Sequence, residues 1–130
     1  MRAAKVLTIN AIASGLIGLA CVLDAHLLAP ILLEAPPPVA VLTLRLLGVG
    51  LTLFAIGVGL VAIQRETPRT ALRVILWADM AWVAATLVLV PMFAAALTGL
   101  GLAAVIAVGA AVAVFAAFEA HALRRATALA

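Results

Sequence analysis

The sequence predicts an all-α polytopic membrane protein in which four transmembrane helices form an up-down bundle. Hydrophobic residues make up 68% of the 130 residues and charged residues only 10%, whereas soluble domains average about 45–50% apolar and about 25% charged. Four apolar segments are each long enough to cross a hydrocarbon core about 30 Å thick. Most of the charged residues lie at the two chain ends and in the connections between these segments.

The whole chain, residues 1–130, is expected to form one domain, because four spans of about 20 residues leave no room for a soluble domain. The expected spans lie at about 6–28, 39–63, 72–92 and 98–120. Three consecutive prolines, residues 36–38, stop the helix before them, because proline has no N–H and crowds the preceding turn. The polar stretch 64–70 is expected to be an aqueous loop, and residues 94–98 a short turn.

The basic residues predict the orientation of the chain in the membrane. In a four-span topology they fall on one side only, at both ends and in the middle loop: Arg2, Lys5, Arg65, Arg69, Arg73, Arg124 and Arg125. Loops on the cytoplasmic side carry an excess of Lys and Arg. Both termini are therefore expected to be cytoplasmic. The net charge of +3 is explained by this topology, so the expected partner is the lipid bilayer and not nucleic acid.

Asp79 is the polar residue that most needs an explanation, because it lies within the third span. An Asp at the centre of a spanning helix costs roughly 2.5–3.5 kcal/mol and is expected to find a partner. Asn10 lies at a similar depth and can donate to Asp79 if the first and third spans touch. Glu119 is expected nearer the membrane surface. Asp79 is then a structural contact, a protonation site for transport, or a contact between subunits.

A second polar pair is expected on the outer side. Asp24 and Arg45 lie at similar depth on spans joined by a short hairpin. Oppositely charged groups that neutralise each other avoid the high cost of either charge alone in the membrane. We therefore expect an ion pair between Asp24 and Arg45.

Small residues predict where helices pack closely. In membranes, glycine and alanine on one face let a neighbouring helix approach. The second and fourth spans carry such faces, whose expected packing residues are Gly48, Gly57, Gly59, Gly109 and Ala113.

No motif for catalysis or metal binding is present in the sequence. Ser14 and Thr86 lack a histidine and a carboxylate at matching depth, so nucleophilic catalysis has no basis and the protein is expected not to be an enzyme. A single cysteine, Cys21, excludes an intrachain disulfide and a site with several thiolates. His26 and His121 are weak candidates for haem ligands, but the topology places them at opposite membrane surfaces. No metal and no cofactor are expected.

Several short motifs carry a resemblance to a known group of proteins. They are Arg45-Leu46-Leu47-Gly48, the basic loop from Arg65 to Arg73, Asp79-Met80-Ala81-Trp82-Val83, Leu97-Thr98-Gly99 and Arg124-Arg125. With them the chain resembles small four-span bacterial membrane proteins of unassigned function. The resemblance implies a bacterial inner-membrane protein. Small multidrug transporters also have four spans, but they place a Glu in the first span where this chain has Ser14 and Gly15.

Three functions are compatible with these observations. The first is a non-enzymatic structural or accessory subunit that associates through its Gly/Ala faces, as a homo-oligomer or within a larger membrane complex. The alternative is a small proton-linked transporter or permeation protein that uses Asp79. The third is a haem- or quinone-binding membrane subunit.

Overall fold

The computed structural model describes residues 2–129, and the regular structure of that part of the chain is helical. The elements are α1 (Ala3–Leu23), α2 (Ala25–Leu32), α3 (Ala40–Ala62), α4 (Arg69–Phe93), the 3-10 turn η1 (Ala94–Ala96) and α5 (Gly99–Ala128). Four of them, α1, α3, α4 and α5, are long and apolar enough to cross a membrane. The chain is therefore a multi-pass membrane protein with the all-α, four-span fold that the sequence predicts.

The first span is shorter than expected. α1 ends at Leu23, and the backbone of Asp24 leaves the helical region with φ −115° and ψ 24°. A separate helix, α2, then begins at Ala25 and contains Pro30. The apolar stretch continues through this break, so hydropathy alone gave no sign of it.

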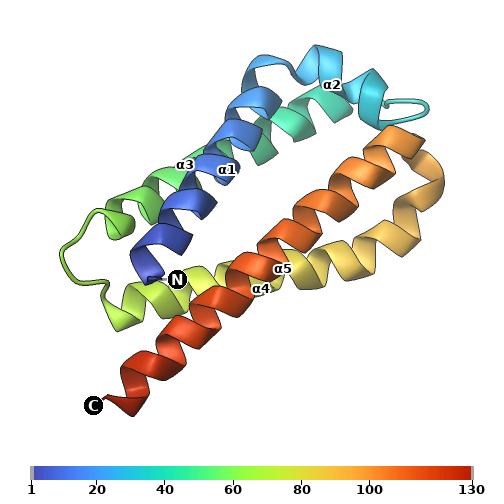
Figure 1. Cartoon of the computed structure of the whole chain (residues 1–130). Coiled ribbons are helices and arrows are strands. Elements are labelled where there is room, and N and C mark those ends of the chain that lie inside the picture. Colours follow the sequence, from blue (N-terminus) through green and yellow to red (C-terminus); the bar gives the residue numbers. More distant parts are fainter. Residues whose placement is uncertain (1, 130) are drawn as a thin grey trace.

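α1 and α3 form a closely packed hairpin (Figure 1). A Cβ atom at Gly48 would lie 2.6 Å from the backbone oxygen of Gly18, and a Cβ atom at Gly18 would lie 2.8 Å from the backbone nitrogen of Thr52. Only glycine lets two helix backbones approach so closely. The glycines of α1 and α3 therefore explain why these two helices pair along their length.

α4 and α5 form the second hairpin. A Cβ atom at Gly109 of α5 would lie 2.7 Å from Cγ2 of Thr86 on α4. Thr98 caps the start of α5, and its side-chain oxygen accepts a hydrogen bond of 2.9 Å from the backbone N–H of Gly101. This contact satisfies one of the free donors that every helix has at its start.

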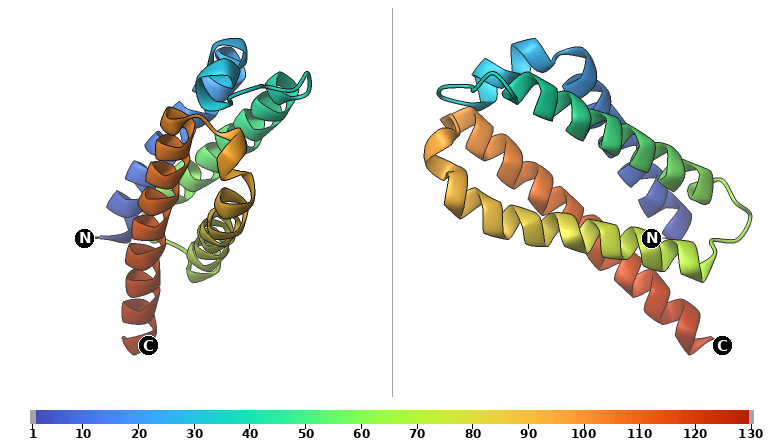
Figure 2. Two further views of the ribbon diagram at one scale, coloured as in Figure 1. Left: turned by 90° about the vertical axis from the view of Figure 1, so that its right-hand side faces the viewer. Right: turned by 180° about the vertical axis from the view of Figure 1, so that it is seen from behind.

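The two hairpins are splayed apart in the middle of the molecule. α3 and α4 follow each other in the chain, yet they diverge from the loop that joins them and make few close contacts (Figures 1 and 2). The hairpins meet instead through α1 and α5 and at the two ends of the bundle. We call the end that holds both chain termini the terminal end, and the end that holds residues 24–40 and 94–99 the opposite end.

At the opposite end, backbone contacts tie the hairpins together. The segment after α2 pairs with the segment before α5 in an isolated antiparallel bridge between Leu33 and Leu97. The N–H of Glu34 donates to the oxygen of Ala96 at 3.0 Å, and the N–H of Thr98 donates to the oxygen of Leu32 at 3.0 Å. Because four backbone groups are satisfied across the joint, both connections are held in place.

Near the terminal end, a small apolar core joins the hairpins. Leu7, Val58, Leu72 and Ile75 are buried together, and Leu123 is among the partly buried residues that pack against them. These residues come from all four long helices. The hairpins are thus held together at two levels and separated between them.

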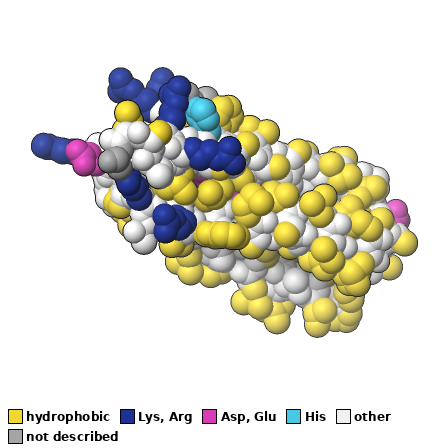
Figure 3. Space-filling view, turned by 90° about the horizontal axis from the view of Figure 1, so that it is seen from below, with side chains coloured by type: hydrophobic (Ala, Val, Ile, Leu, Met, Phe, Trp, Pro, Cys, Tyr) yellow, Lys and Arg dark blue, Asp and Glu magenta, His cyan; other side chains and the backbone are white. Residues whose placement is uncertain are grey.

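The outer surface matches a membrane setting. Large apolar side chains are widely exposed on the long helices, among them Leu16 at 66%, Leu53 at 64% and Leu87 at 71%. Figure 3 shows Lys and Arg side chains gathered at one end of the face in view, with hydrophobic side chains over most of the rest. An apolar surface with charged side chains gathered toward its ends is what a bilayer requires of a spanning protein.

Alanine substitutions at Gly48 and Gly57 should change stability in opposite directions. Gly48→Ala should lower the free energy of unfolding by about 1–3 kcal/mol, because its new Cβ would press on the backbone of Gly18. Gly57 has nothing within 4 Å of the added Cβ, so Gly57→Ala should raise that free energy by about 0.5–1 kcal/mol through better helix propensity. Thermal unfolding in mild detergent measures both, and shifts of the same sign would contradict the close approach of α1 and α3.

Candidate functional site

The candidate site is built around Asn10, on the inward face of α1. Its side-chain nitrogen Nδ2 donates to Oδ2 of Asp79 at 2.7 Å and to Oε1 of Glu119 at 3.1 Å. Its side-chain oxygen accepts from Oγ of Ser14 at 3.0 Å. One amide therefore links α1 to α4 and α5. We call Asn10, Ser14, Asp79 and Glu119 the polar cluster.

All four side chains of the polar cluster are shielded from the surroundings. Asn10 is 0% exposed, Glu119 1%, Asp79 3% and Ser14 8%. No Lys or Arg of the described residues forms an ion pair with either carboxyl group. Oε2 of Glu119 is buried and has no hydrogen-bond partner within residues 2–129. The cluster thus gathers two acids out of water without a cation to balance them.

The sequence anticipated one half of this cluster. Asn10 and Asp79 were placed at matching depth on the first and third spans, with a contact expected only if those spans touch, and the structure brings them within hydrogen-bonding distance. α1 and α4 have little other contact along their length, so the hydrogen bond joins helices that are not otherwise closely packed.

Glu119 was expected near the membrane surface, and this expectation was wrong. α5 extends to Ala128, so Glu119 still lies inside the bundle. The fourth span was expected to end at about residue 120, which put Glu119 next to the aqueous phase. In the structure Ala116 and Glu119 are buried, whereas Ala117 is exposed. A seven-residue step from Gly109 to Ala116 marks the buried face of α5.

The expected ion pair between Asp24 and Arg45 does not form. Both side chains are exposed and no ion pair joins them. The reason is the break after α1: Asp24 occupies the junction between α1 and α2 and is not part of a continuous span that faces α3. Arg45 can extend its long side chain toward the membrane surface and needs no buried partner.

Several of the five small residues that were expected to pack closely against another helix do so within this chain. Gly48 contacts α1 and Gly109 contacts α4, as described above, and a Cβ at Gly59 would lie 3.8 Å from Cβ of Ala11. Ala113 lines a shallow apolar hollow between α4 and α5. Gly57 alone of the five is exposed with open space around it. Most of the faces expected to bind other subunits are thus occupied within this chain.

The two histidines do not approach the site. His26 and His121 are both exposed and lie on α2 and near the end of α5. Within residues 2–129, no group of three or more His, Cys, Asp or Glu residues is arranged to hold a metal ion.

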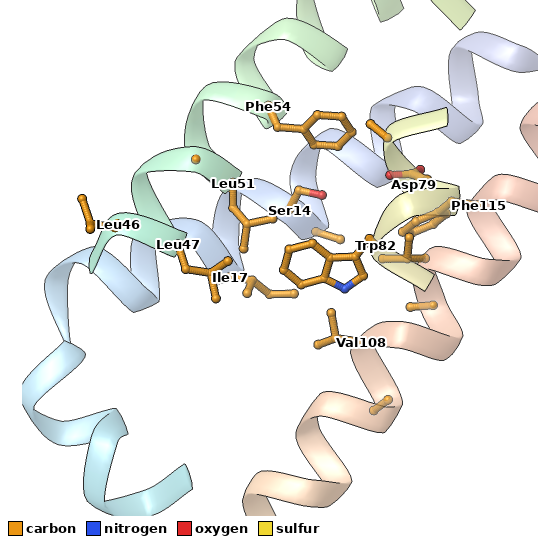
Figure 4. Close-up of a pocket in the computed structure, with 16 residues that line it drawn as sticks. Ser14, Ile17, Leu46, Leu47, Leu51, Phe54, Asp79, Trp82, Val108 and Phe115 are labelled. Carbon is orange, nitrogen blue, oxygen red and sulfur yellow. The ribbon is translucent and has the colours of Figure 1, made fainter. Parts of the chain in front are cut away.

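Beside the polar cluster lies a cleft of about 550 Å³ in the middle of the molecule. Residues of all four long helices line it, and of these helices α3 and α4 make few close contacts with each other. Among them are Ser14, Leu51, Phe54, Asp79, Trp82 and Phe115. Figure 4 shows the indole ring of Trp82 projecting into the cleft between Leu51 and Val108, with Asp79 on the same helix. The sequence did not predict a place for Trp82 in this cleft.

The geometry lets the two carboxyl groups act as a pair. Asp79 and Glu119 both accept a hydrogen bond from Nδ2 of Asn10, which brings the two carboxyl groups close together. Two neighbouring carboxylates in a low-dielectric setting are costly when both are charged, and a proton bridging them removes that cost. Asp79 also lines the cleft, whereas Glu119 lies behind it. The site can therefore hold a proton beside a space that is large enough for a small molecule.

Comparison of the chain with family models, curated proteins and solved structures finds no match.

Replacing Asn10 should destabilise the fold through both carboxyl groups. Asn10→Leu should lower the free energy of unfolding by about 1–3 kcal/mol, because it leaves buried acceptors without their donor. Ser14→Ala, which removes one hydrogen bond at the edge of the cluster, should have a smaller effect of about 1 kcal/mol. Thermal or denaturant unfolding in detergent gives both values.

Asn10→Leu should lower the free energy of unfolding by a smaller amount in a variant that lacks the Glu119 carboxyl group. In a Glu119→Leu background, Asn10→Leu leaves one orphaned carboxyl group instead of two, so the two substitutions should show a coupling energy in a double-mutant cycle. Strict additivity would show that Asn10 does not act through Glu119.

Proposed function

We propose that the protein is a small proton-linked transporter in which Asp79 and Glu119 exchange a proton. The observation that carries the proposal is the pair of buried carboxyl groups, without a cation, beside a cleft in the middle of the membrane-spanning helices. Ionisable residues inside a membrane are rare and mark substrate and ion pathways and proton relays. A purely structural contact would need only one hydrogen bond, not two acids.

The surroundings of the pair favour a single exchangeable proton. α1 contributes Asn10 and Ser14, α4 contributes Asp79 and α5 contributes Glu119. Of these side chains only the two carboxyl groups titrate, and the side chains that α3 gives to the cleft are apolar. Release of the proton leaves negative charge that water or a bound solute must offset. Proton release and solute binding are thereby linked.

The arrangement of the hairpins supports movement around the site. α3 and α4 make few close contacts with each other. The hairpins are joined at the opposite end by two backbone hydrogen bonds and near the terminal end by the polar cluster and a small core. A change in the charge of the cluster would weaken one joint and leave the other, which gives the hairpins a route to rock against each other.

A structural or accessory subunit remains the second candidate. Its basis is Gly57, which is exposed and has open space where a neighbouring helix can approach. It has less support than the transporter, because Gly18, Gly48 and Gly109 make their close contacts within the chain. Nor does it account for two acids beside a cleft.

We further propose that the protein lies in a bacterial inner membrane with both termini in the cytoplasm. The basic residues support this orientation, because the loop at residues 63–68 and both chain ends lie at the terminal end, where Arg65, Arg69, Arg124 and Arg125 are exposed. Residues 33–39, at the opposite end, contain no Lys or Arg.

Reporter fusions should confirm this topology. A fluorescent protein at the C-terminus should fold and fluoresce, and alkaline phosphatase should be active when inserted at residues 36–38 and inactive at residue 66, since phosphatase requires the periplasm. The positive-inside bias is the physical reason. Phosphatase activity at the C-terminus would reverse the orientation.

Substitution of either buried acid should abolish proton-coupled flux. Liposomes that contain the protein and a trapped pH-sensitive dye would be given gradients of small neutral, cationic and anionic apolar solutes, with the membrane potential clamped. At least one solute should drive proton movement. In Asp79→Asn and Glu119→Gln the signal should fall to that of protein-free liposomes, because neither variant retains the carboxyl pair.

Asp24→Asn is the matched control, since it removes an exposed acid at a helix junction and should leave the flux unchanged. The proposal fails if no solute moves protons through the wild-type protein. It fails equally if Asp79→Asn behaves like the wild type.

A further inference from the structure

The lining of the cleft carries information about what it binds. Its volume of about 550 Å³ lies within the range of about 300–1,000 Å³ typical of small-molecule sites. The chain has four phenylalanines and two tryptophans, and Phe54, Trp82 and Phe115 all line this one cleft. They come from α3, α4 and α5, so three helices each direct an aromatic ring toward the same space (Figure 4). Such concentration of rings is more than lipid contact requires.

The ionisable side chain in the wall of the cleft is acidic. No Lys, Arg or His lines it, and Ser14 and Asp79 are the only side chains with polar oxygens in its wall. Behind Asp79 lies Glu119, whose Oε2 is buried without a hydrogen-bond partner in the described chain. Negative charge here would be poorly screened, because the site is remote from bulk water and its dielectric constant is low. A positive ligand is the natural complement.

Aromatic rings add to this preference. The face of an aromatic ring attracts a cation, by about 0.5–1 kcal/mol at an exposed site and by about 2 kcal/mol when the site is desolvated. Trp82 lies one turn beyond Asp79 on α4 and projects into the cleft. A cation placed near the Asp79 carboxyl group would therefore also meet the indole ring. Leu51, Phe54 and Val108 would contact its apolar substituents.

We propose that the cleft binds a small lipophilic cation, such as a quaternary ammonium or phosphonium ion with aromatic or alkyl substituents. The cation reaches the cleft from the bilayer between α3 and α4, and its charge offsets the one that Asp79 and Glu119 expose on losing their proton. The inference rests on the proposed function, because the cation and the proton compete for the same carboxyl pair. A lipid chain or a neutral apolar molecule is the rival occupant.

Two probes of the same shape and opposite charge test the inference. Tetraphenylphosphonium and tetraphenylborate would be titrated into the purified full chain in detergent. The Trp77→Phe variant leaves Trp82 as the sole fluorescent indole, since the chain has two tryptophans. Tetraphenylphosphonium should quench Trp82 in a saturable manner, and tetraphenylborate should not.

The acid variants then identify the recognition element. Asp79→Asn should weaken tetraphenylphosphonium binding by about tenfold or more, because a desolvated charge pair is lost. Asp24→Asn should bind with wild-type affinity. Circular dichroism and a monodisperse elution profile would show whether Asp79→Asn remains folded. If it does not, Trp82→Leu is the second variant. Because it lacks the fluorescent reporter, its affinity for tetraphenylphosphonium is measured by equilibrium dialysis beside the wild type, and it should be severalfold weaker through loss of the ring.

The outcomes separate this inference from the proposed function. Equal binding of both probes, or of tetraphenylphosphonium to the wild type and a folded Asp79→Asn variant, would overturn the inference and indicate a neutral or lipid occupant. Proton-coupled flux of other solutes without phosphonium binding would also overturn it while the transporter stands. Charge-selective binding without any coupled flux would support the inference and refute transport.

Discussion

The three hydrogen bonds of the Asn10 side chain are the interaction on which the arrangement of this protein depends. Helices in a membrane gain no hydrophobic driving force from one another, so close packing and polar contacts must hold them together. Glycines bring α1 to α3 and α4 to α5. Between the hairpins, a single amide donates to acids on α4 and α5. Because no Lys or Arg of residues 2–129 pairs with those acids, the hydrogen bonds from the amide are what stabilise their burial.

The cleft follows from where these contacts are placed. A backbone bridge joins the hairpins at one end, and the polar cluster and the core around Leu7 join them toward the other. Between the two levels α3 and α4 diverge, and the wall is left to leucines, alanines and three aromatic rings. Asp79, which needs Asn10 for its burial, thus faces a space that can admit a ligand, and Glu119 lies behind it. The polar cluster that joins the two hairpins therefore also contains the carboxyl groups to which we assign the proton.

The sequence predicts the fold class and the number of spans, because length and hydropathy decide both. It also places Asn10 at the depth of Asp79, since depth along a straight helix is a matter of counting residues, but it does not show whether the first and third spans touch. It does not predict the role of Glu119, because hydropathy does not locate the end of α5, which continues to Ala128. The pairing of Asp24 with Arg45 fails for a related reason: the helix breaks at Asp24. The cleft depends on how far α3 diverges from α4, which no local pattern encodes.

Labelling with dicyclohexylcarbodiimide tests the central claim most directly, because this apolar reagent modifies carboxyl groups that carry a proton and are reachable from the lipid phase. The polar cluster and its cleft predict that peptide mapping by mass spectrometry finds the label on Asp79, which lines the cleft, and not on the exposed acids Asp24 and Glu34. The Asn10→Leu variant would show whether the amide positions the reactive group. Label on Asp24 or Glu34, with Asp79 unmodified, would contradict a protonated carboxyl pair beside an open cleft.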